Sequence, residues 1–235
     1  MMLTKIKNIL QSFNFIHRHK AQLFYAKLIK KGDLCFDIGA NLGKKSRLML
    51  AAGGKVIAFE PQNSCSKNLG ELQKKYSAFD FYPLAVGAQN ETKKLHLSKY
   101  TEIATLSDEF IENYTTDDVY WSGFEMVEVK SLDTLIATYG KPNYCKIDVE
   151  GYEFEILSHL HHTIPMIEFE FTEKFLADTL KIIDRLANDK TTFNYILNEH
   201  LKFQLKNWVS ATEMKTILMQ LNPKKLHGNL FVKHE

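Results

Sequence analysis

The chain has 235 residues, of which 45% are hydrophobic and 25% are charged, so it is long enough for one globular domain with a continuous core. This charged fraction is average and argues against long disordered regions. Three scattered cysteines without a CxxC pair argue against a disulfide framework or a zinc site, and no stretch approaches the roughly 18 apolar residues that span a bilayer. Because no secretory signal is visible either, the sequence predicts a soluble cytoplasmic protein.

The amino-terminal part is predicted to be helical. Two sets of apolar residues at helical spacing each form one apolar stripe; they are Ile6, Ile9, Leu10 and Phe13, then Ala21, Phe24, Tyr25 and Leu28. We therefore expect a helical leader at residues 1–31 that packs on or precedes a single domain at residues 32–235.

The leader is also strongly basic, with seven Lys or Arg and no Asp or Glu, although the whole chain has a formal net charge of only +2. Basic residues between positions 5 and 31 suit an anionic partner, and a solvated helix face explains them as well. The remainder of the chain is mildly acidic, which counts against a broad nucleic-acid surface.

After the leader, short apolar runs alternate with amphipathic segments. They predict strands at 34–38, 55–59 and 79–82 and helices at 44–52 and 63–76. Continuous apolar strands between helices indicate a parallel sheet that is covered on both faces. The predicted fold is therefore α/β and Rossmann-like, with a mostly parallel central sheet and helices on both faces.

The second half continues this alternation after a less regular middle. Residues 98–124 lack strong periodicity, which is more typical of a functional segment than of a structural one. Tyr120 and Trp121 in this segment suit stacking on a sugar or aromatic acceptor, and packing beneath a loop explains them equally well. Around and beyond it we predict strands at 92–97, 125–129, 144–148, 164–171, 201–206 and 228–233 and helices at 131–139, 152–160 and 173–188.

A glycine-containing turn joins the first predicted strand to its helix, with the sequence Asp37-Ile38-Gly39-Ala40-Asn41-Leu42-Gly43. Gly39 and Gly43 allow the backbone to turn tightly and approach a ligand, and the next helix offers free N–H groups to a carboxylate or phosphate. Glu60 ends the second strand, 21 residues after Gly39, where an acid can accept hydrogen bonds from ribose hydroxyls. Together these features predict a nucleotide-type cofactor.

The acid at position 37 distinguishes between cofactors. A dinucleotide fingerprint reads G-x-G-x-x-G, but Asn41 replaces the middle glycine here, and Asp37 would repel a pyrophosphate. A sulfonium cofactor with an ammonium group would be attracted instead, so the pattern favours S-adenosyl-L-methionine over NAD(P). An NAD(P)-dependent oxidoreductase on a similar fold and a non-catalytic binding protein on a degenerate methyltransferase fold are the alternatives.

Four segments occur in the order FDIGANLG, VIAFEP, LAVG and KIDVEGYE, and this combination resembles the FkbM family of S-adenosyl-L-methionine-dependent methyltransferases over residues 33–170. The resemblance implies a class I methyltransferase fold and O-methylation of a hydroxyl on a saccharide or small natural product. It also implies the cofactor contacts: Asp37, Gly39, Ala40 and Asn41 at the methionine end, Glu60 at the ribose, and Pro61, Ala85 and Val86 near the adenine.

Three acids follow the strand predicted at 144–148, within Asp148-Val149-Glu150-Gly151-Tyr152-Glu153. Because ligands of open α/β sheets bind where the strand order reverses, Asp148 and Asp37 are both expected to face the transferred methyl group. We expect Asp148 to position cofactor and acceptor, and Glu150 to act as the base or to orient the hydroxyl. Favourable charges at a helix N-terminus are the competing interpretation, above all for Glu153.

No metal site is predicted. The paired carboxylates of Asp148 and Glu150 suit a hard divalent cation, but two acids from one loop are too few to predict one. The three histidines at 159, 161 and 162 mark a helix end and have no Glu or Cys at ligand spacing.

Overall fold

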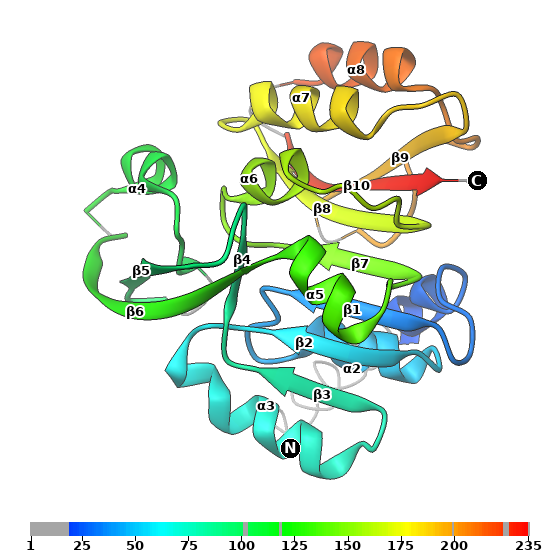
Figure 1. The fold of residues 1–235 in the computed structure, drawn as a ribbon. Coiled ribbons are helices and arrows are strands. Elements are labelled where there is room, and N and C mark those ends of the chain that lie inside the picture. The colour runs from blue at the N-terminus through cyan, green and yellow to red at the C-terminus, as the bar shows by residue number, and fades with distance from the viewer. Residues whose placement is uncertain (1–18, 101–102, 118, 199, 223–225, 235) are drawn as a thin grey trace, which may run out of the picture.

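The computed structural model describes residues 19–100, 103–117, 119–198, 200–222 and 226–234. Its centre is a seven-stranded sheet in the order β3-β2-β1-β7-β8-β10-β9 (Figure 1). Strand β10 runs antiparallel to both neighbours, and the other pairs are parallel. The strands are β1 (Leu34–Ile38), β2 (Lys55–Phe59), β3 (Phe79–Tyr82), β7 (Tyr144–Ile147), β8 (Met166–Thr172), β9 (Thr191–Leu197) and β10 (His227–His234).

Helices cover both faces of this sheet. The helical residues 19–25, α2 (Lys44–Ala51) and α3 (Asn63–Lys75) pack on one face, and α5 (Leu132–Tyr139), α6 (Glu153–Ser158), α7 (Leu176–Leu186) and α8 (Ala211–Gln220) on the other. Successive strand residues alternate between the two layers, so Phe36 contacts the α5–α8 layer and Cys35 the α2–α3 layer. The predicted α/β fold with a mostly parallel sheet is confirmed. Among the described helices, none is long and apolar enough to cross a bilayer.

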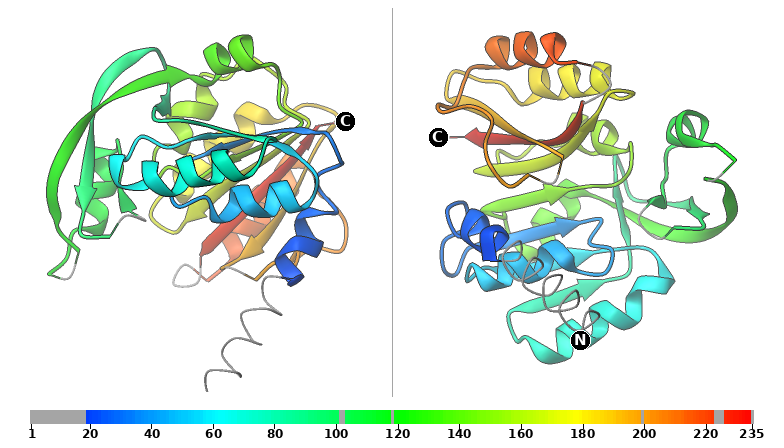
Figure 2. Two further views of the ribbon diagram at one scale, coloured as in Figure 1. Left: turned by 90° about the horizontal axis from the view of Figure 1, so that it is seen from below. Right: turned by 180° about the vertical axis from the view of Figure 1, so that it is seen from behind.

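A three-stranded sheet in the order β4-β6-β5 projects beyond the carboxyl ends of the central strands (Figures 1 and 2). It consists of β4 (Ala85–Gly87), β5 (Glu91–Ser98) and β6 (Trp121–Ser131), and with α4 (Asp108–Tyr114) we call it the side lobe. The lobe contains the segment 98–124, for which the sequence predicted no structure. Helix α4 begins where the Ser107 side chain accepts a hydrogen bond from the Phe110 amide.

Aromatic rings attach the side lobe to the rest of the molecule. Phe110 stacks on Tyr114 with ring centroids 4.4 Å apart and on Phe175 at 6.0 Å, and Trp121 meets Phe110 edge-on at 6.2 Å. This contact favours the packing interpretation of Trp121. Tyr120 is exposed.

The amino-terminal helix is held by a buried polar contact. The Tyr25 hydroxyl donates to the carboxylate of Glu168, which also binds the hydroxyl of Tyr144. Ala21, Phe24 and Tyr25 are buried, as their predicted apolar stripe requires. The first predicted stripe, at residues 6–13, lies outside the described residues.

The strand predicted at 201–206 is wrong. These residues run beside β9 without forming a ladder, because the Asn194 side chain binds the amide and the carbonyl of Leu205, at 3.3 and 3.1 Å. Their alternation reflects half-buried apolar side chains between exposed polar ones. The strand at this edge is β9, which the sequence analysis missed together with α8.

Candidate functional site

A cavity of about 290 Å³ opens at the carboxyl ends of β1, β2 and β7. The loops after these strands line it, together with Leu95, Ala104, Thr105 and Leu106 of the side lobe and its approach. Most residues predicted to bind cofactor or acceptor also line the cavity, namely Gly39, Ala40, Asn41, Glu60, Pro61, Ala85, Val86, Asp148 and Glu150. Asp37 and Gly43 do not line it.

The glycine turn brings two loops into contact at the cavity. Gly39 has φ 72°, and a Cβ built there would lie 1.8 Å from the carbonyl oxygen of Asp148. Only glycine avoids this collision, which is why the turn after β1 can lie directly against the loop after β7. Gly43 also has a left-handed backbone, with φ 73°, where α2 begins.

Glu60 is almost fully buried and holds the turn in place. Its carboxylate accepts hydrogen bonds from the amides of Asn41 (2.8 Å) and Gln62 (2.9 Å). Burial raises the pKa of Glu60, and the two backbone bonds oppose that rise. Glu60 therefore orders the loop in addition to lining the cavity, a role that its prediction as a ribose acceptor did not include.

Asp37 is buried behind the cavity and is not among its lining residues, so its predicted place facing the transferred methyl group stays a prediction. Its burial follows from strand alternation: Asp37 points to the same face as Cys35, beneath α2, where Ser46 donates a hydrogen bond to its Oδ2. Its Oδ1 lies 3.7 Å from the Lys146 ammonium group. This Oδ1 is the buried side-chain oxygen for which the described residues provide no hydrogen-bond partner.

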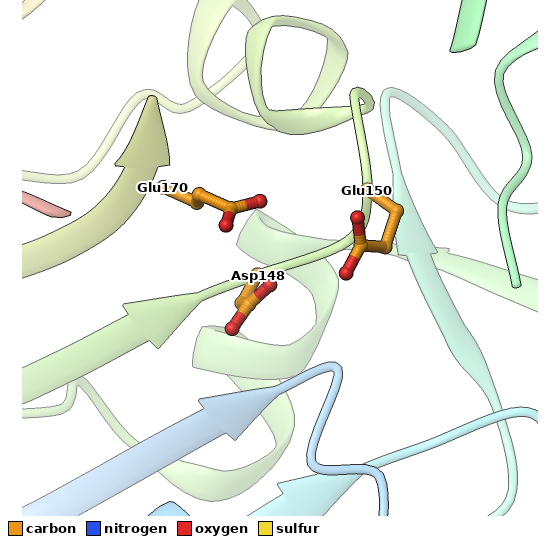
Figure 3. Close-up of side chains that lie close together, drawn as sticks. All are labelled: Asp148, Glu150 and Glu170. Carbon is orange, nitrogen blue, oxygen red and sulfur yellow. The ribbon is translucent and has the colours of Figure 1, made fainter. Parts of the chain in front are cut away.

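Three carboxylates from two segments converge on the cavity (Figure 3). Asp148 and Glu150 come from the loop after β7 and Glu170 from β8, and an oxygen of each lies within 4.8 Å of the others. We call Asp148, Glu150 and Glu170 the carboxylate triad. Such a triad could share protons, accept hydrogen bonds from hydroxyls or hold a divalent cation.

The environment of the two glutamates of the triad favours their protonated forms. Burial, followed by the negative charges of Glu170 and Asp148, raises the pKa of Glu150 well above the usual glutamate value. Burial also raises the pKa of Glu170, although the hydrogen bond from His227 Nε2 at 2.9 Å works against it. A carboxylate with a raised pKa is a stronger proton acceptor than an ordinary glutamate.

Two contacts fix the loop that carries Asp148 and Glu150. The Thr105 hydroxyl, which the approach to α4 provides, donates to the Glu150 carbonyl oxygen at 2.7 Å. The Glu153 carboxylate accepts the amides of Val149 (2.9 Å) and Gly151 (3.1 Å). Glu150 has φ 55°, so its left-handed backbone needs such support. Burial, and then Glu170, raises the pKa of Glu153 to about 8.

The lining residues that sequence analysis did not single out include Thr105, Lys146, Glu170 and His227. The sequence pattern could have indicated two of them, Lys146 and Glu170. Lys146 interrupts an otherwise apolar strand, and Glu168 and Glu170 alternate with apolar residues in a strand that is covered on both faces. Charged residues inside a buried strand need partners, so they mark a position worth testing. Thr105 and His227 had no such signal.

Comparison with known proteins gives distant relatives. The chain is 22% identical over 160 residues to the hexuronic acid methyltransferase AglP of Haloferax volcanii, covering 68% of this chain and 63% of that protein. The chain thus spans less than two thirds of that relative. Among solved structures, the precorrin-6y C5,15-methyltransferase of Geobacter metallireducens is 10% identical with a TM-score of 0.48, over 92% of this chain and 87% of the other. The fibrillarin of Aeropyrum pernix, solved with bound S-adenosyl-L-methionine, is 8% identical with a TM-score of 0.48, over 87% and 68%.

A family model gives the stronger match. The methyltransferase FkbM domain matches residues 37–204, which include the glycine turn, Glu60 and the whole carboxylate triad. Since this match covers well over half of the sequence, the chain belongs to the FkbM methyltransferase family and has the class I methyltransferase fold.

Proposed function

We propose that this methyltransferase transfers a methyl group from S-adenosyl-L-methionine to a hydroxyl of a saccharide or small natural-product acceptor. One observation carries the proposal. The glycine turn and Glu60, which suit a nucleoside-containing donor, share one cavity with three carboxylates that suit a hydroxyl acceptor.

The chain's residues fit the donor. Gly39, Asn41 and Glu60 line the cavity, and the Glu60 carboxylate is a hydrogen-bond acceptor of the kind that suits a ribose hydroxyl. When bound, S-adenosyl-L-methionine would supply a methyl group that is activated by its sulfonium.

The acceptor needs alignment and a place for its proton. Formation of the new oxygen–methyl bond releases the hydroxyl proton, and we assign its acceptance to Glu150, whose carboxylate lines the cavity. Asp148 and Glu170 would orient the hydroxyl beside it. In-line alignment of the acceptor oxygen with the methyl group can provide much of the rate enhancement. The protein therefore needs few catalytic groups beyond the proton acceptor.

A saccharide acceptor is supported by the named activity of the relative from Haloferax volcanii and by the chemistry of the triad. Carboxylates accept hydrogen bonds from neighbouring hydroxyls, of which sugars have several. The acceptor class is thus argued from the residues together with a distant similarity.

The first test is ligand binding followed by transfer. S-adenosylhomocysteine should raise the melting temperature, whereas NAD(P) should not. Transfer of labelled methyl to a panel of glycans and to cell extract, with products identified by mass, should then give an O-methylated product. Stabilisation by NAD(P) alone would instead support the oxidoreductase interpretation, and binding without transfer to any acceptor would support a non-catalytic protein.

The role of Glu150 is tested by Glu150→Gln, which keeps the shape of the side chain but removes its basicity. We expect kcat to fall by about 10² to 10⁴, the usual contribution of a general base, while S-adenosylhomocysteine binds as before. Full turnover of this variant across pH would remove Glu150 from the mechanism.

We expect the reaction to need no metal, because Lys146 already places a positive charge 3.0 Å from Asp148. Activity should therefore survive EDTA. Loss of activity in EDTA that Mg²⁺ restores would reassign the triad as cation ligands.

A further inference from the structure

Lys146 is a lysine buried inside the central sheet, with 2% of its surface exposed. Its ammonium group lies 3.0 Å from Asp148 Oδ2 and 3.7 Å from Asp37 Oδ1, and it donates a hydrogen bond to the carbonyl oxygen of Gly39 at 3.3 Å. Gly39 and Asp148 belong to the two loops that meet at the cavity, and Asp37 lies near the end of β1 beneath them.

Strand register places this lysine between acids. Lys146 on β7 is the register partner of Asp37 on β1 and of Glu168 on β8. Tyr25 and Tyr144 satisfy Glu168 with their hydroxyls, whereas Asp37 Oδ1 has no hydrogen-bond partner among the residues that the structure describes. Because a buried carboxylate is costly unless it is paired, Lys146 compensates Asp37 on one side and Asp148 on the other.

The lysine is charged in this position. Burial alone would lower the pKa of Lys146, but the charges of Asp148 and Asp37 outweigh burial and raise the pKa. Lys146 is therefore an ammonium group at neutral pH.

The groups that Lys146 contacts lie on both sides of the reaction. Gly39 belongs to the turn that we assign to the donor, and Asp148 belongs to the triad that we assign to the acceptor. These two loops touch directly, since the Asp148 amide donates to the Ile38 carbonyl at 3.1 Å. An ammonium group that binds both loops limits how far one can shift against the other.

We propose that Lys146 is a positioning residue for methyl transfer, which fixes the donor turn and Asp148 relative to each other. This inference rests on the proposed function. Lys146 exchanges no proton in the reaction and acts through Gly39 and Asp148. Since misplacement of reacting groups by about 1 Å can cost about 10² in rate, holding this distance matters for turnover.

The test compares three variants by calorimetric binding of S-adenosylhomocysteine and by methyl transfer to the acceptor found in the labelling screen. We expect Lys146→Met to weaken binding at least about tenfold and to lower kcat at saturating donor. Lys146→Arg keeps the charge and should recover part of both quantities. The Met variant leaves a buried acid uncompensated and could fail to fold, so a third variant is needed.

The double variant Asp37→Asn with Lys146→Met removes one charge of each sign and so keeps the net charge of the cluster. If Lys146 positions the loops, this folded variant should still bind S-adenosylhomocysteine at least about tenfold more weakly than the wild type. Wild-type binding and turnover of the double variant would overturn the proposal, because charge balance would then be the whole role of the lysine.

Tyr144→Phe is the matched control. Tyr144 lies two residues before Lys146 on the same face of β7 and contacts Glu168 outside the cavity. We expect it to lower the melting temperature without changing binding or kcat. Failure of the wild type to bind S-adenosylhomocysteine would reject the proposed function itself, whereas binding that is unaffected in every Lys146 variant would reject only this inference.

Discussion

The two sides of the cavity, which we assign to the donor and to the acceptor, are built in different ways. The donor side comes from the turns after β1 and β2, which are near in sequence and act mainly through the backbone, as in the bond from the Asn41 amide to Glu60. The acceptor side gathers side chains from distant segments: Thr105, Glu150, Glu170 and His227. We therefore expect the side built from backbone to tolerate almost no substitution that changes its shape. On the side built from side chains, single substitutions should change one functional group at a time.

The largest effect is expected on the backbone-built side. Gly39→Ala would place a Cβ 1.8 Å from the Asp148 carbonyl oxygen at a φ of 72°, so the two loops must separate. We expect binding of S-adenosylhomocysteine to fall more than about 100-fold, as measured by calorimetry, because alignment at the turn is lost.

The control for this change is Gly70→Ala in α3, where nothing lies within 4 Å of the new Cβ. This variant should gain about 0.5–1 kcal/mol in free energy of unfolding and bind S-adenosylhomocysteine normally. Unchanged binding by Gly39→Ala would show that the close approach of the two loops at Gly39 is not needed for donor binding.

On the acceptor side, single substitutions should separate binding from turnover. Glu170→Gln keeps the size of the side chain but removes one charge of the triad, so we expect kcat to fall by about tenfold or more while donor binding stays constant. Steady-state kinetics with both substrates varied measures this split. An equal loss of donor affinity would mean that the two sides are not independent.

The pH dependence of kcat provides a sharper test of the triad. Glu150 can accept a proton only when ionised, and its pKa is raised by burial and by Glu170 and Asp148. Activity should therefore rise with pH through a value above the usual glutamate pKa of about 4.3. In Glu170→Gln, the loss of one neighbouring negative charge should move this acid limb to lower pH. A limb that stays in place would exclude coupling between these two glutamates.

The smallest effect is expected at Thr105, which connects the side lobe to the loop that carries Glu150. Thr105→Val removes the hydroxyl donor to the Glu150 carbonyl with little change of shape, which costs about 1 kcal/mol, or about fivefold in kcat. Thr105→Ser keeps the hydroxyl and should retain most of the activity. Equal kinetics of the two variants would mean that the side lobe does not support Glu150.

The same contrast explains what the sequence could predict. The strands at 34–38, 55–59 and 79–82 were predicted with the observed bounds, because short apolar runs between turns carry that information locally. The glycine turn and Glu60 were recognisable for the same reason, since their spacing in one βαβ unit is fixed. Glu170 and His227 meet only because β8 and β10 pair in the sheet, and no local pattern encodes that pairing.

The errors near the carboxyl end have a related cause. Residues 201–206 alternate like a strand, but Asn194 competes for the backbone of Leu205 and replaces the ladder. Helix α8 buries only Met214 and Leu218, so its apolar periodicity was weak. Its start was nevertheless readable, because Ser210 and Glu213 form a capping box.

The contact between Tyr25 and Glu168 bears on how this protein can be divided. The family match begins at residue 37, and the predicted leader ends at residue 31. A fragment cut at either boundary would start after Tyr25 and lack it. Such a fragment would lack the Tyr25 hydroxyl that donates to the fully buried Glu168. Glu168 is the register partner of Lys146, which in turn is the register partner of Asp37. We therefore expect a fragment that keeps Tyr25, and so begins before the family match, to be more stable than one that starts after it.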